Sequence, residues 1–404
     1  MSNQTVIVGY ARTPIARFSG GLAPLSATNL GAIAIDAALR KAGVAPEQVG
    51  YVVMGHVLQA GQGQITARQA AVEAGVPMTT PAVTVNKVCL SGMTAIADAD
   101  RLIRAGDFDV VVAGGMESMT NAPYLLPQGR FGYRMGDGTL VDAMMWDGLT
   151  DPFEHVSMGA ASDDVNTRLQ IDREAQDEWA ARSHERAVTA WKEGLFADEV
   201  VSVQVPSGRG NRGEAVIVEQ DEGMRPGTTA ERLAGLRPAF SQQGTITAGN
   251  ASQISDGAAA LVLTSRDKAD ELGLSALGTV RGWATVAGPD SSLHNQPSRA
   301  IAAVSERLGD DPAAYDLYEI NEAFAAVAIQ SVRDLGLDED RVNVNGGAVA
   351  LGHPIGATGA RITITLLAEL ARRGGGRGVA ALCGGGGQGD ALVVDVSDHD
   401  PVVS

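Results

Sequence analysis

Apolar runs alternate with segments of helical period along the first third of the chain. Residues 27–42 carry apolar side chains at helical spacing, and Gly43 follows as a helix-ending residue. Short, continuously apolar runs such as Tyr51–Gly55 are typical of buried strands. The whole pattern predicts strands at residues 5–10, 51–55, 81–88 and 108–113, and helices at residues 27–42, 67–74 and 93–105.

The last third of the chain repeats this plan. Strands are predicted at residues 315–320, 342–345, 379–382 and 391–396, and a helix at residues 359–373. In each third, a strand ending in Val-Asn precedes a reactive turn, a helix and a second strand with Gly-Gly. The repeat covers residues 85–115 and 344–385, which indicates a diverged internal duplication. Two similar halves that face each other would bring Cys89 close to His353 and Cys383.

The middle of the chain, residues 119–250, has a different character. It begins with a stretch rich in proline and glycine and continues through the acidic residues 147–154. One helix is predicted at residues 172–193, with Asp172 as its N-cap and Glu174 favourable to the helix start. We interpret this region as an insertion that covers the site where Cys89, His353 and Cys383 would meet.

Composition and charge restrict the class of protein. A chain of 404 residues suggests two or three domains, and 4% aromatic residues with 50 glycines favour an α/β protein built from small and aliphatic side chains. The formal net charge of −17 opposes binding to nucleic acid and to anionic membranes, although a local basic loop can still bind phosphate. We see neither a basic leader nor a membrane-spanning apolar stretch, so we expect a cytoplasmic location.

Two cysteines and one histidine lie at glycine-containing turns. Cys89 follows a strand-like run and precedes Ser91-Gly92, Cys383 opens a run of four glycines, and His353 lies between Gly352 and Pro354. A thiolate nucleophile and an imidazole base in such turns suggest covalent acyl chemistry. Either cysteine taken alone is more simply a small buried apolar residue, and two cysteines are too few for a disulfide framework.

The start of a helix just after Cys89 is expected to stabilise a thiolate and to lower the pKa of this thiol. His353 has an ordinary pKa that suits a general base. Of the other histidines, His155 is ambiguous because it lies in the insertion. The remaining four are expected at the surface or as satisfied core residues, namely His56, His184, His294 and His399.

Two further motifs each allow a functional and a purely structural interpretation. The Cys383 turn contains a G-x-G-x-x-G pattern, but a strand rather than a helix is predicted after it, so we reject dinucleotide binding. Asn321-Glu322 at a strand end is either a helix N-cap with a first-turn acid or an amide that positions water or a carbonyl oxygen. The sequence does not favour one over the other. The chain shows no metal-ligand spacing.

These residues together resemble the thiolase family over nearly the whole chain. The segments that carry the resemblance are 86–92, 114–119, 321–324, 345–359 and the Cys383 turn. The resemblance implies a five-layered α/β/α/β/α core from two duplicated halves. It divides the chain into an N-terminal half (residues 1–118 and 251–275), an inserted loop domain over the coenzyme A site (119–250) and a C-terminal half (276–404).

The resemblance is closest to the biosynthetic branch and implies acetyl-CoA C-acetyltransferase activity. Cys89 would accept the acetyl group, His353 would activate Cys89, and Cys383 would remove the α-proton of a second acetyl-CoA. Asn321, through a water, together with His353 would stabilise the enolate, and the N–H groups of Cys89 and Gly385 would hold the acyl oxygen. The products are acetoacetyl-CoA and CoA, so coenzyme A is a substrate and no cofactor or metal is expected.

Coenzyme A contacts carry over by the same resemblance. Arg225 matches an arginine near the nucleotide phosphates. Two positions depart from the family pattern, because Ser157 replaces a histidine that normally touches coenzyme A and Gln253 stands where many members have glycine. His155 could substitute for the missing histidine. The residues expected near the pantetheine or acyl chain are Leu149, Met158, Phe240, Ala248, Ser252, Ala323 and Phe324.

The resemblance also implies a homotetramer, with residues 125–135 as a contact loop. Three alternatives remain open. One is a degradative 3-ketoacyl-CoA thiolase of broader chain length. Another is a non-catalytic thiolase-fold carrier of acyl-CoA or lipid, which both cysteines and His353 argue against. The third is a ketoacyl synthase, which Cys383 argues against because those enzymes lack a second catalytic cysteine.

Overall fold

The computed structural model describes residues 4–206 and 215–397, where ten strands form one sheet that bends into two halves. The halves join between β1 and β11 through the pairs Val6–Thr279 and Ile7–Gly278. The N-terminal half contains β1 (Thr5–Arg12), β10 (Ser255–Ser265), β5 (Val110–Ser118), β3 (Tyr51–Gly55) and β4 (Ala82–Val85), and β2 (Ala16–Arg17) pairs with β10. The C-terminal half contains β11 (Gly278–Ala287), β14 (Gln388–Val396), β13 (Gly376–Gly384) and β12 (Leu317–Ile320).

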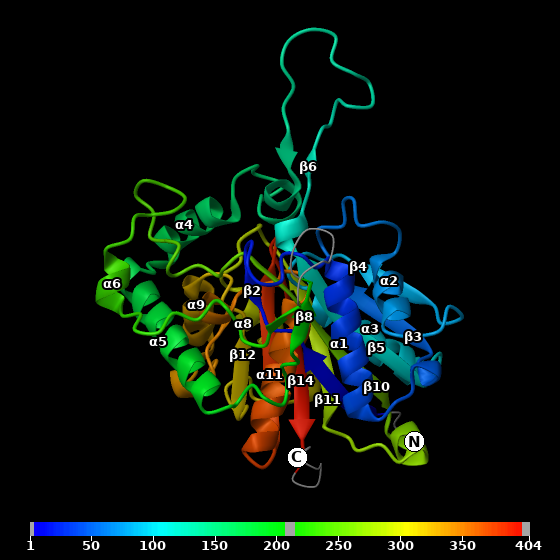
Figure 1. Cartoon of the computed structure of the whole chain (residues 1–404). Helices are drawn as coiled ribbons and strands as arrows, with labels where there is room; N and C mark the ends of the chain where they lie inside the picture. The colour runs from blue at the N-terminus through cyan, green and yellow to red at the C-terminus, as the bar shows by residue number, and fades with distance from the viewer. Residues whose placement is uncertain (1–3, 207–214, 398–404) are drawn as a thin grey trace.

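Helices cover the sheet halves in layers (Figure 1). Helices α3 (Ser91–Ala105) and α11 (Thr358–Arg372) lie between the halves, since both contact strands of each. The outer face of the N-terminal half is covered by α1 (Ala27–Ala42), which also packs on α2 (Thr66–Glu73). The outer face of the C-terminal half is covered by α8 (Gln296–Leu308), which packs on α9 (Ala325–Leu335). The predicted five-layered α/β/α/β/α core is therefore confirmed.

The interior is built from alanine and aliphatic side chains, as the low aromatic content predicts. Three apolar clusters fill the interfaces between helix layers and sheet layers, one at each outer interface and one shared by the two inner interfaces. The central cluster joins both halves, because it contains Met93 and Ile96 of α3 together with Ile362 and Leu366 of α11. Burial of this cluster stabilises the two halves as one unit.

Glycines allow the two central helices to approach at backbone distance. A Cβ atom added to Gly359 would lie 2.8 Å from the Cβ of Met93, and one added to Gly92 would lie 2.9 Å from the backbone nitrogen of Ala360. Real Cβ atoms essentially never show contacts this short. Since α3 begins just after Cys89 and α11 just after His353, this contact fixes the distance between their turns.

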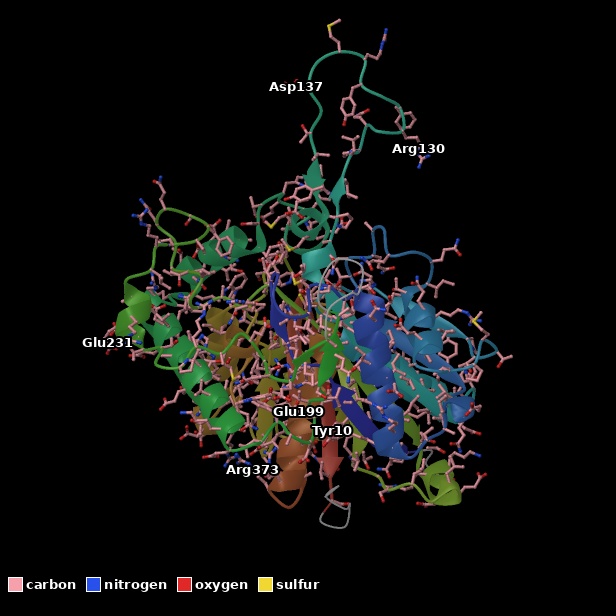
Figure 2. The ribbon with its side chains drawn as sticks, viewed as in Figure 1. Tyr10, Arg130, Asp137, Glu199, Glu231 and Arg373 are labelled. Carbon is pink, nitrogen blue, oxygen red and sulfur yellow. The ribbon has the colours of Figure 1, made fainter. Side chains whose placement is uncertain are left out.

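The insertion extends over one side of the core and beyond it (Figure 1). Strands β6 (Tyr124–Leu125) and β7 (Val141–Asp142) form a hairpin that projects far from the body, with Arg130 and Asp137 near its tip (Figure 2). The other elements are a π-helical turn at Met144–Gly148, the helices α4 (Met158–Leu169), α5 (Arg173–Lys192) and α6 (Ala230–Ala234), and the strands β8 (Val203–Val205) and β9 (Val216–Val218).

A buried ion-pair group ties the insertion to the first strand. Arg12 of β1 donates from Nε to Glu199 at 2.9 Å and from one terminal nitrogen to Asp221 at 2.8 Å, and all three side chains are buried. Glu199 and the nearby Tyr10 lie in the body of the molecule (Figure 2). A buried charge is stable only with partners, so replacement of any one of these three side chains is expected to destabilise the fold.

Most predicted elements agree with the structure to within a few residues, and α1 has the predicted bounds. The strand predicted at residues 342–345 is wrong. Only Val342 forms a bridge, with Tyr318, and Asn343 adopts a positive φ of 48°. The Asn343 side chain instead accepts from the N–H of Ile320 and donates to its carbonyl, both at 2.8 Å, so a side-chain amide replaces the strand ladder.

The prediction of one clear helix in the insertion was incomplete, because α4 and α6 also form. Asp172 caps α5 as predicted, accepting from the backbone N–H of Ala175 at 2.8 Å. The remaining short elements are α7 (Arg266–Leu272), α10 (Ala348–Leu351) and 3₁₀ turns at Pro46–Gln48, Met119–Asn121 and Glu339–Arg341. Of the helices within the described ranges, none is long and apolar enough to cross a membrane. The cytoplasmic location stays a prediction.

We predict that Gly359→Ala weakens the contact between the halves. The added methyl group would overlap the backbone of α3, and overpacking of this kind costs about 1–3 kcal/mol. Thermal unfolding followed by circular dichroism should show a lower Tm for this variant. Gly235→Ala is the matched control, because the added Cβ would meet its nearest atom only at 3.6 Å. Equal Tm values for the two variants would contradict the argument.

Candidate active site

Cys89 lies in a constrained turn between β4 and α3. Val88 has a positive φ of 50°, which is strained for a β-branched residue. Side chains hold the turn: the Val88 N–H donates to Asn86 Oδ1 at 3.0 Å, the Lys87 N–H donates to Ser91 Oγ at 2.8 Å, and Ser91 Oγ donates to the Val88 carbonyl at 2.6 Å. Because three hydrogen bonds fix it, the turn presents Cys89 in one direction.

An ion pair fastens this turn to the other half of the molecule. Lys87 Nζ lies 2.7 Å from Oδ1 of the buried Asp390, which belongs to β14. Thr94 of α3 donates to the other oxygen of Asp390 at 3.0 Å, and Thr285 donates to the first at 2.7 Å. Because β14 begins where the Cys383 turn ends, this group also sets the position of Cys89 relative to that turn.

Cys383 lies near the end of β13, and the glycines after it turn the chain back into β14. Gly386 and Gly387 adopt positive φ values of 80° and 69°, which glycine accepts without steric cost. A Cβ atom on Gly387 would overlap the backbone of Asp290. Since a strand and not a helix follows, the rejection of a dinucleotide fingerprint is confirmed.

The structure brings Cys89, Cys383 and Gly385 together. The backbone N–H groups of Gly385 and of Cys89 itself face the Cys89 sulfur, and the Cys89 side chain lies near enough to raise the pKa of Cys383. Both N–H groups are therefore donors placed directly beside this sulfur.

The predicted lowering of the Cys89 pKa is wrong for the free protein. Burial raises the pKa of Cys89 to about 12, although the N–H groups of Gly385 and Cys89 act in the opposite direction. Burial also raises the pKa of Cys383. The loss of solvation outweighs the helix start, so both side chains are thiols and not thiolates at neutral pH.

The tautomer of His353 follows from its hydrogen bonds. Thr358 Oγ1 donates its hydrogen to the Pro354 carbonyl at 3.0 Å, so it must accept from His353 Nδ1, which lies 2.7 Å away. Nε2 is therefore unprotonated, buried, and without a partner among the residues that the structure describes. Burial, with a smaller contribution from Arg361, lowers the pKa of His353 to about 3 and keeps the imidazole neutral.

The loop of His353 meets the Cys89 turn through apolar packing. Ile355, two residues after His353, belongs to a buried cluster with Val57 and Met119, and Cys89 packs against the same cluster. The backbone N–H of Gly356 donates to Glu117 at 3.0 Å. These contacts confirm the prediction that the His353 loop and the Cys89 turn lie close together.

Asn321 and Glu322 have different roles, and neither caps a helix. Helix α9 begins at Ala325 with Phe324 at the N-cap position, so the N-cap interpretation is wrong. Both side-chain polar atoms of Asn321 are buried and lack partners within the described ranges. A buried amide without partners is costly in an apolar protein, which indicates that it binds something supplied from outside the chain. Its backbone N–H donates to Ala381, next to the Cys383 strand end, at 2.9 Å.

Glu322 organises the backbone behind Asn321. Its buried carboxylate accepts from four groups, at distances from 2.7 to 3.0 Å. The donors come from α5, from the segment before the His353 loop and from that loop itself, namely Trp179 Nε1, Ser183 Oγ, Asn343 Nδ2 and the Val349 N–H. This function of Glu322 was not predicted from the sequence.

Glu117 was also missed. It lies in the fully buried strand β5 and accepts from the N–H groups of Val57, Leu58 and Gly356 at 3.1, 3.1 and 3.0 Å. Burial raises the pKa of Glu117 to about 7, against the effect of these three donors. An acidic residue inside an otherwise apolar strand was the available signal, because such a group is kept only where it has partners.

The residues expected to contact coenzyme A are only partly gathered around the thiols. Ala323 and Phe324 are in the apolar cluster of Cys383, and Met158 packs against it. Leu149 packs against the cluster that Cys89 joins. The backbone N–H of Ser252 donates to Ala323 at 3.1 Å, the ring of Phe240 contacts that of Phe324 edge to face, and Ala248 and Arg225 are exposed.

The departures from the family pattern have structural explanations. Ser157 is the N-cap of α4 and accepts from the N–H of Ala160 at 3.2 Å. His155 is exposed with a φ of 56°, and its role in place of the missing histidine stays a prediction. The side-chain amide of Gln253 donates to backbone carbonyls of the insertion and of α10.

The other histidines fit the core interpretation where they are described. His56, His184 and His294 are buried, and each has a hydrogen-bond partner, namely Thr66, the Arg225 N–H and Asn166. His399 lies outside the described residues. No group of three or more His, Cys, Asp and Glu residues within the described ranges is placed to hold a metal ion.

We predict that alkylation of native Cys89 accelerates steadily with pH. Because only the thiolate reacts and burial raises its pKa, the rate with iodoacetamide should rise from about pH 7 to about pH 10 without a plateau. Mass spectrometry of the Cys89 peptide measures the alkylation rate. The urea-unfolded protein is the control and should level off near the ordinary pKa of about 8.5. A plateau at about pH 8 in the native protein would contradict the assigned direction.

Comparison with known proteins agrees with this geometry. The chain matches the thiolase N-terminal domain over residues 5–267 and the thiolase C-terminal domain over residues 274–396. It is 56% identical to a probable acetyl-CoA acetyltransferase of Mycolicibacterium smegmatis, over 96% of this chain and 100% of that one. It is 48% identical to acetyl-CoA acetyltransferase of Cupriavidus necator, over 96% and 98%. The crystal structure of the Bacillus anthracis acetyl-CoA acetyltransferase superposes with a TM-score of 0.94 at 42% identity, covering 98% of this chain and 99% of that one. The chain belongs to the thiolase family.

Proposed function

We propose that this protein is an acetyl-CoA C-acetyltransferase, which condenses two acetyl-CoA into acetoacetyl-CoA and CoA and also catalyses the reverse thiolysis. The observation that carries the proposal is the Cys89 sulfur, which lies beside Cys383 and faces two fixed N–H donors. Relatives that bear this activity in their names cover nearly the whole chain, which supports the same reaction here.

In the first half-reaction, Cys89 takes the acetyl group. His353 Nε2 removes the Cys89 proton as the sulfur attacks the thioester carbonyl, and the N–H groups of Cys89 and Gly385 stabilise the oxyanion. The C–S bond to CoA breaks, and the CoA sulfur takes the proton of Cys383. Acetyl-Cys89, protonated His353, a Cys383 thiolate and free CoA result.

In the second half-reaction, the Cys383 thiolate removes an α-proton from another acetyl-CoA. Asn321, through a water, and protonated His353 stabilise the enolate oxygen. This role explains why the side-chain amide of Asn321 has no partner among the residues that the structure describes. The carbanion attacks the acetyl carbon on Cys89, the C–S bond breaks, and the Cys89 sulfur regains its proton from His353. The enzyme returns to its starting state, and acetoacetyl-CoA leaves.

The buried environment suits this sequence of proton transfers. Two thiols and a neutral imidazole carry no charge in the free protein, so no unpaired ion is stored in the apolar site. Each oxyanion that arises during the reaction has a donor prepared for it, either the two N–H groups or Asn321. Fixed donors in a water-poor site stabilise such charges more strongly than water does.

We predict that acetyl-CoA alone adds one acetyl group to Cys89, detectable by mass spectrometry of the intact protein and of its peptides. Cys89→Ala should show no adduct and no thiolysis, since it removes the only acceptor that the mechanism uses. Cys383→Ala should still become acetylated, although more slowly because the CoA sulfur loses its proton donor. It should lose about a hundredfold or more in condensation rate, as loss of a general base does.

Wild type should cleave acetoacetyl-CoA faster than a medium-chain 3-ketoacyl-CoA at equal concentration. Comparable or faster cleavage of the longer substrate would instead support a degradative 3-ketoacyl-CoA thiolase. Absence of both the adduct and thiolysis in the folded wild type would overturn the proposal in favour of a carrier.

We further propose a homotetramer in which the projecting hairpin contacts another copy. A two-stranded hairpin alone is at best marginally stable in water. This one exposes large apolar side chains around residues 125–135, including Phe131 at 85% and Met135 at 95% exposure. Four more exposed apolar residues belong to the same hairpin, namely Tyr124, Leu126, Tyr133 and Leu140. Such an apolar surface on an extended arm is suited to an interface.

We predict that the double variant F131S/M135S has a smaller mass in solution than the wild type, because it removes the two most exposed apolar side chains of the hairpin. Sedimentation velocity measures the change. Val216→Ser, at an exposed position of β9, is the control and should sediment like the wild type. A monomeric wild type would sink the proposed tetramer.

A further inference from the structure

Residues 250–254, which form the connector before β10, run along the segment that carries Asn321. Ala251 forms a bridge with Phe324, the N–H of Ser252 donates to Ala323 at 3.1 Å, and the N–H of Ala325 donates to Asn250 at 2.9 Å. The connector is therefore held in place by the segment that follows Asn321.

The same connector holds the backbone of His353. The His353 N–H lies 3.1 Å from the Gln253 carbonyl and 3.2 Å from Ser255 Oγ. Ser255 Oγ in turn donates to the Gln253 carbonyl at 2.7 Å. Gln253 of the connector and Ser255 at the start of β10 thus fix the backbone of His353.

The Gln253 side chain reaches further into the loop. Its Nε2 lies 2.8 Å from the Gly223 carbonyl, 3.1 Å from that of Val349 and 3.3 Å from that of Ala350. Val349 and Ala350 belong to α10, a single helical turn whose terminal carbonyls need donors. Gly223 belongs to the insertion, so one amide group joins the insertion, α10 and the connector.

The geometry leaves little freedom around this amide. A Cβ atom on Gly223 would lie 2.5 Å from the Ala350 carbonyl and 2.9 Å from Gln253 Nε2. Gly352, between α10 and His353, has a φ of 109°, which only glycine adopts easily. The orientation of α10 therefore determines the direction in which Gly352 delivers His353.

We propose that Gln253 is a positioning residue for His353. Its side-chain amide donates to carbonyls at the end of α10 and to Gly223 of the insertion. Its backbone carbonyl accepts the His353 N–H. Together these contacts hold the imidazole at the thiols and link it to the insertion. A glycine at this position lacks the amide, so this chain has a support that the common family pattern does not provide. The inference rests on the proposed role of His353 as the base.

The test replaces Gln253 with methionine, which has nearly the same shape but no N–H donors. We expect kcat for thiolysis of acetoacetyl-CoA to fall about tenfold, the effect of losing one or two hydrogen bonds that orient a catalytic group. KM should change less than about twofold, and acetylation of Cys89 by acetyl-CoA should slow by the same factor as kcat. Gln64→Met, at an exposed glutamine before α2, is the matched control.

The outcomes separate this inference from the proposed function. If wild type is active and Gln253→Met keeps its kcat, the inference is wrong, whether or not Tm falls, because the amide then serves stability alone. If folded wild type shows no thiolysis or acetylation, the proposed function itself fails. Should Gln253→Met not fold, Gln253→Gly replaces it, since glycine also lacks side-chain N–H donors and adds no charge beside the three carbonyls, and the same kcat criterion applies.

Discussion

The contact between α3 and α11 is the constraint on which the remaining structure depends. Gly92 and Gly359 let the helices meet at backbone distance, and the strands of both halves pack around this pair. Each helix begins just after a reactive residue, Cys89 or His353. A site assembled from two halves could drift by ångströms if only side chains separated them, whereas backbone contact leaves no compressible layer.

Burial has two consequences in this site that act together. It suppresses charge on Cys89, Cys383 and His353, so the resting groups are neutral. It also strengthens every fixed dipole that meets a charge during the reaction. The Thr358 hydroxyl is essential to this arrangement, because it selects the tautomer in which Nε2 can accept a proton.

The sequence contained enough information for the fold class and for the central thiols. Helical and strand periods predicted α1, β3 and α3 within a few residues, and the repeated Val-Asn turns predicted that two distant segments would meet. It could not predict the Asn343 side chain replacing a strand, because that depends on a contact with Ile320 on another element. The predicted direction of the Cys89 pKa shift was also wrong, because the local sequence shows the helix start but not the burial created by the second half.

The supports of the His353 loop lie in segments that are distant in sequence. Glu322 holds its start at Val349, Ser255 and Gln253 hold the histidine, and Glu117 holds its end at Gly356. These supports come from strand ends or their connectors. Two of them also reach the insertion: Gln253 at Gly223, and Glu322 at Trp179 and Ser183 of α5. The insertion carries several of the expected coenzyme A contacts. A shift of the insertion would therefore be transmitted through both side chains to the loop that carries His353, which gives substrate binding a physical route to the position of the proposed base.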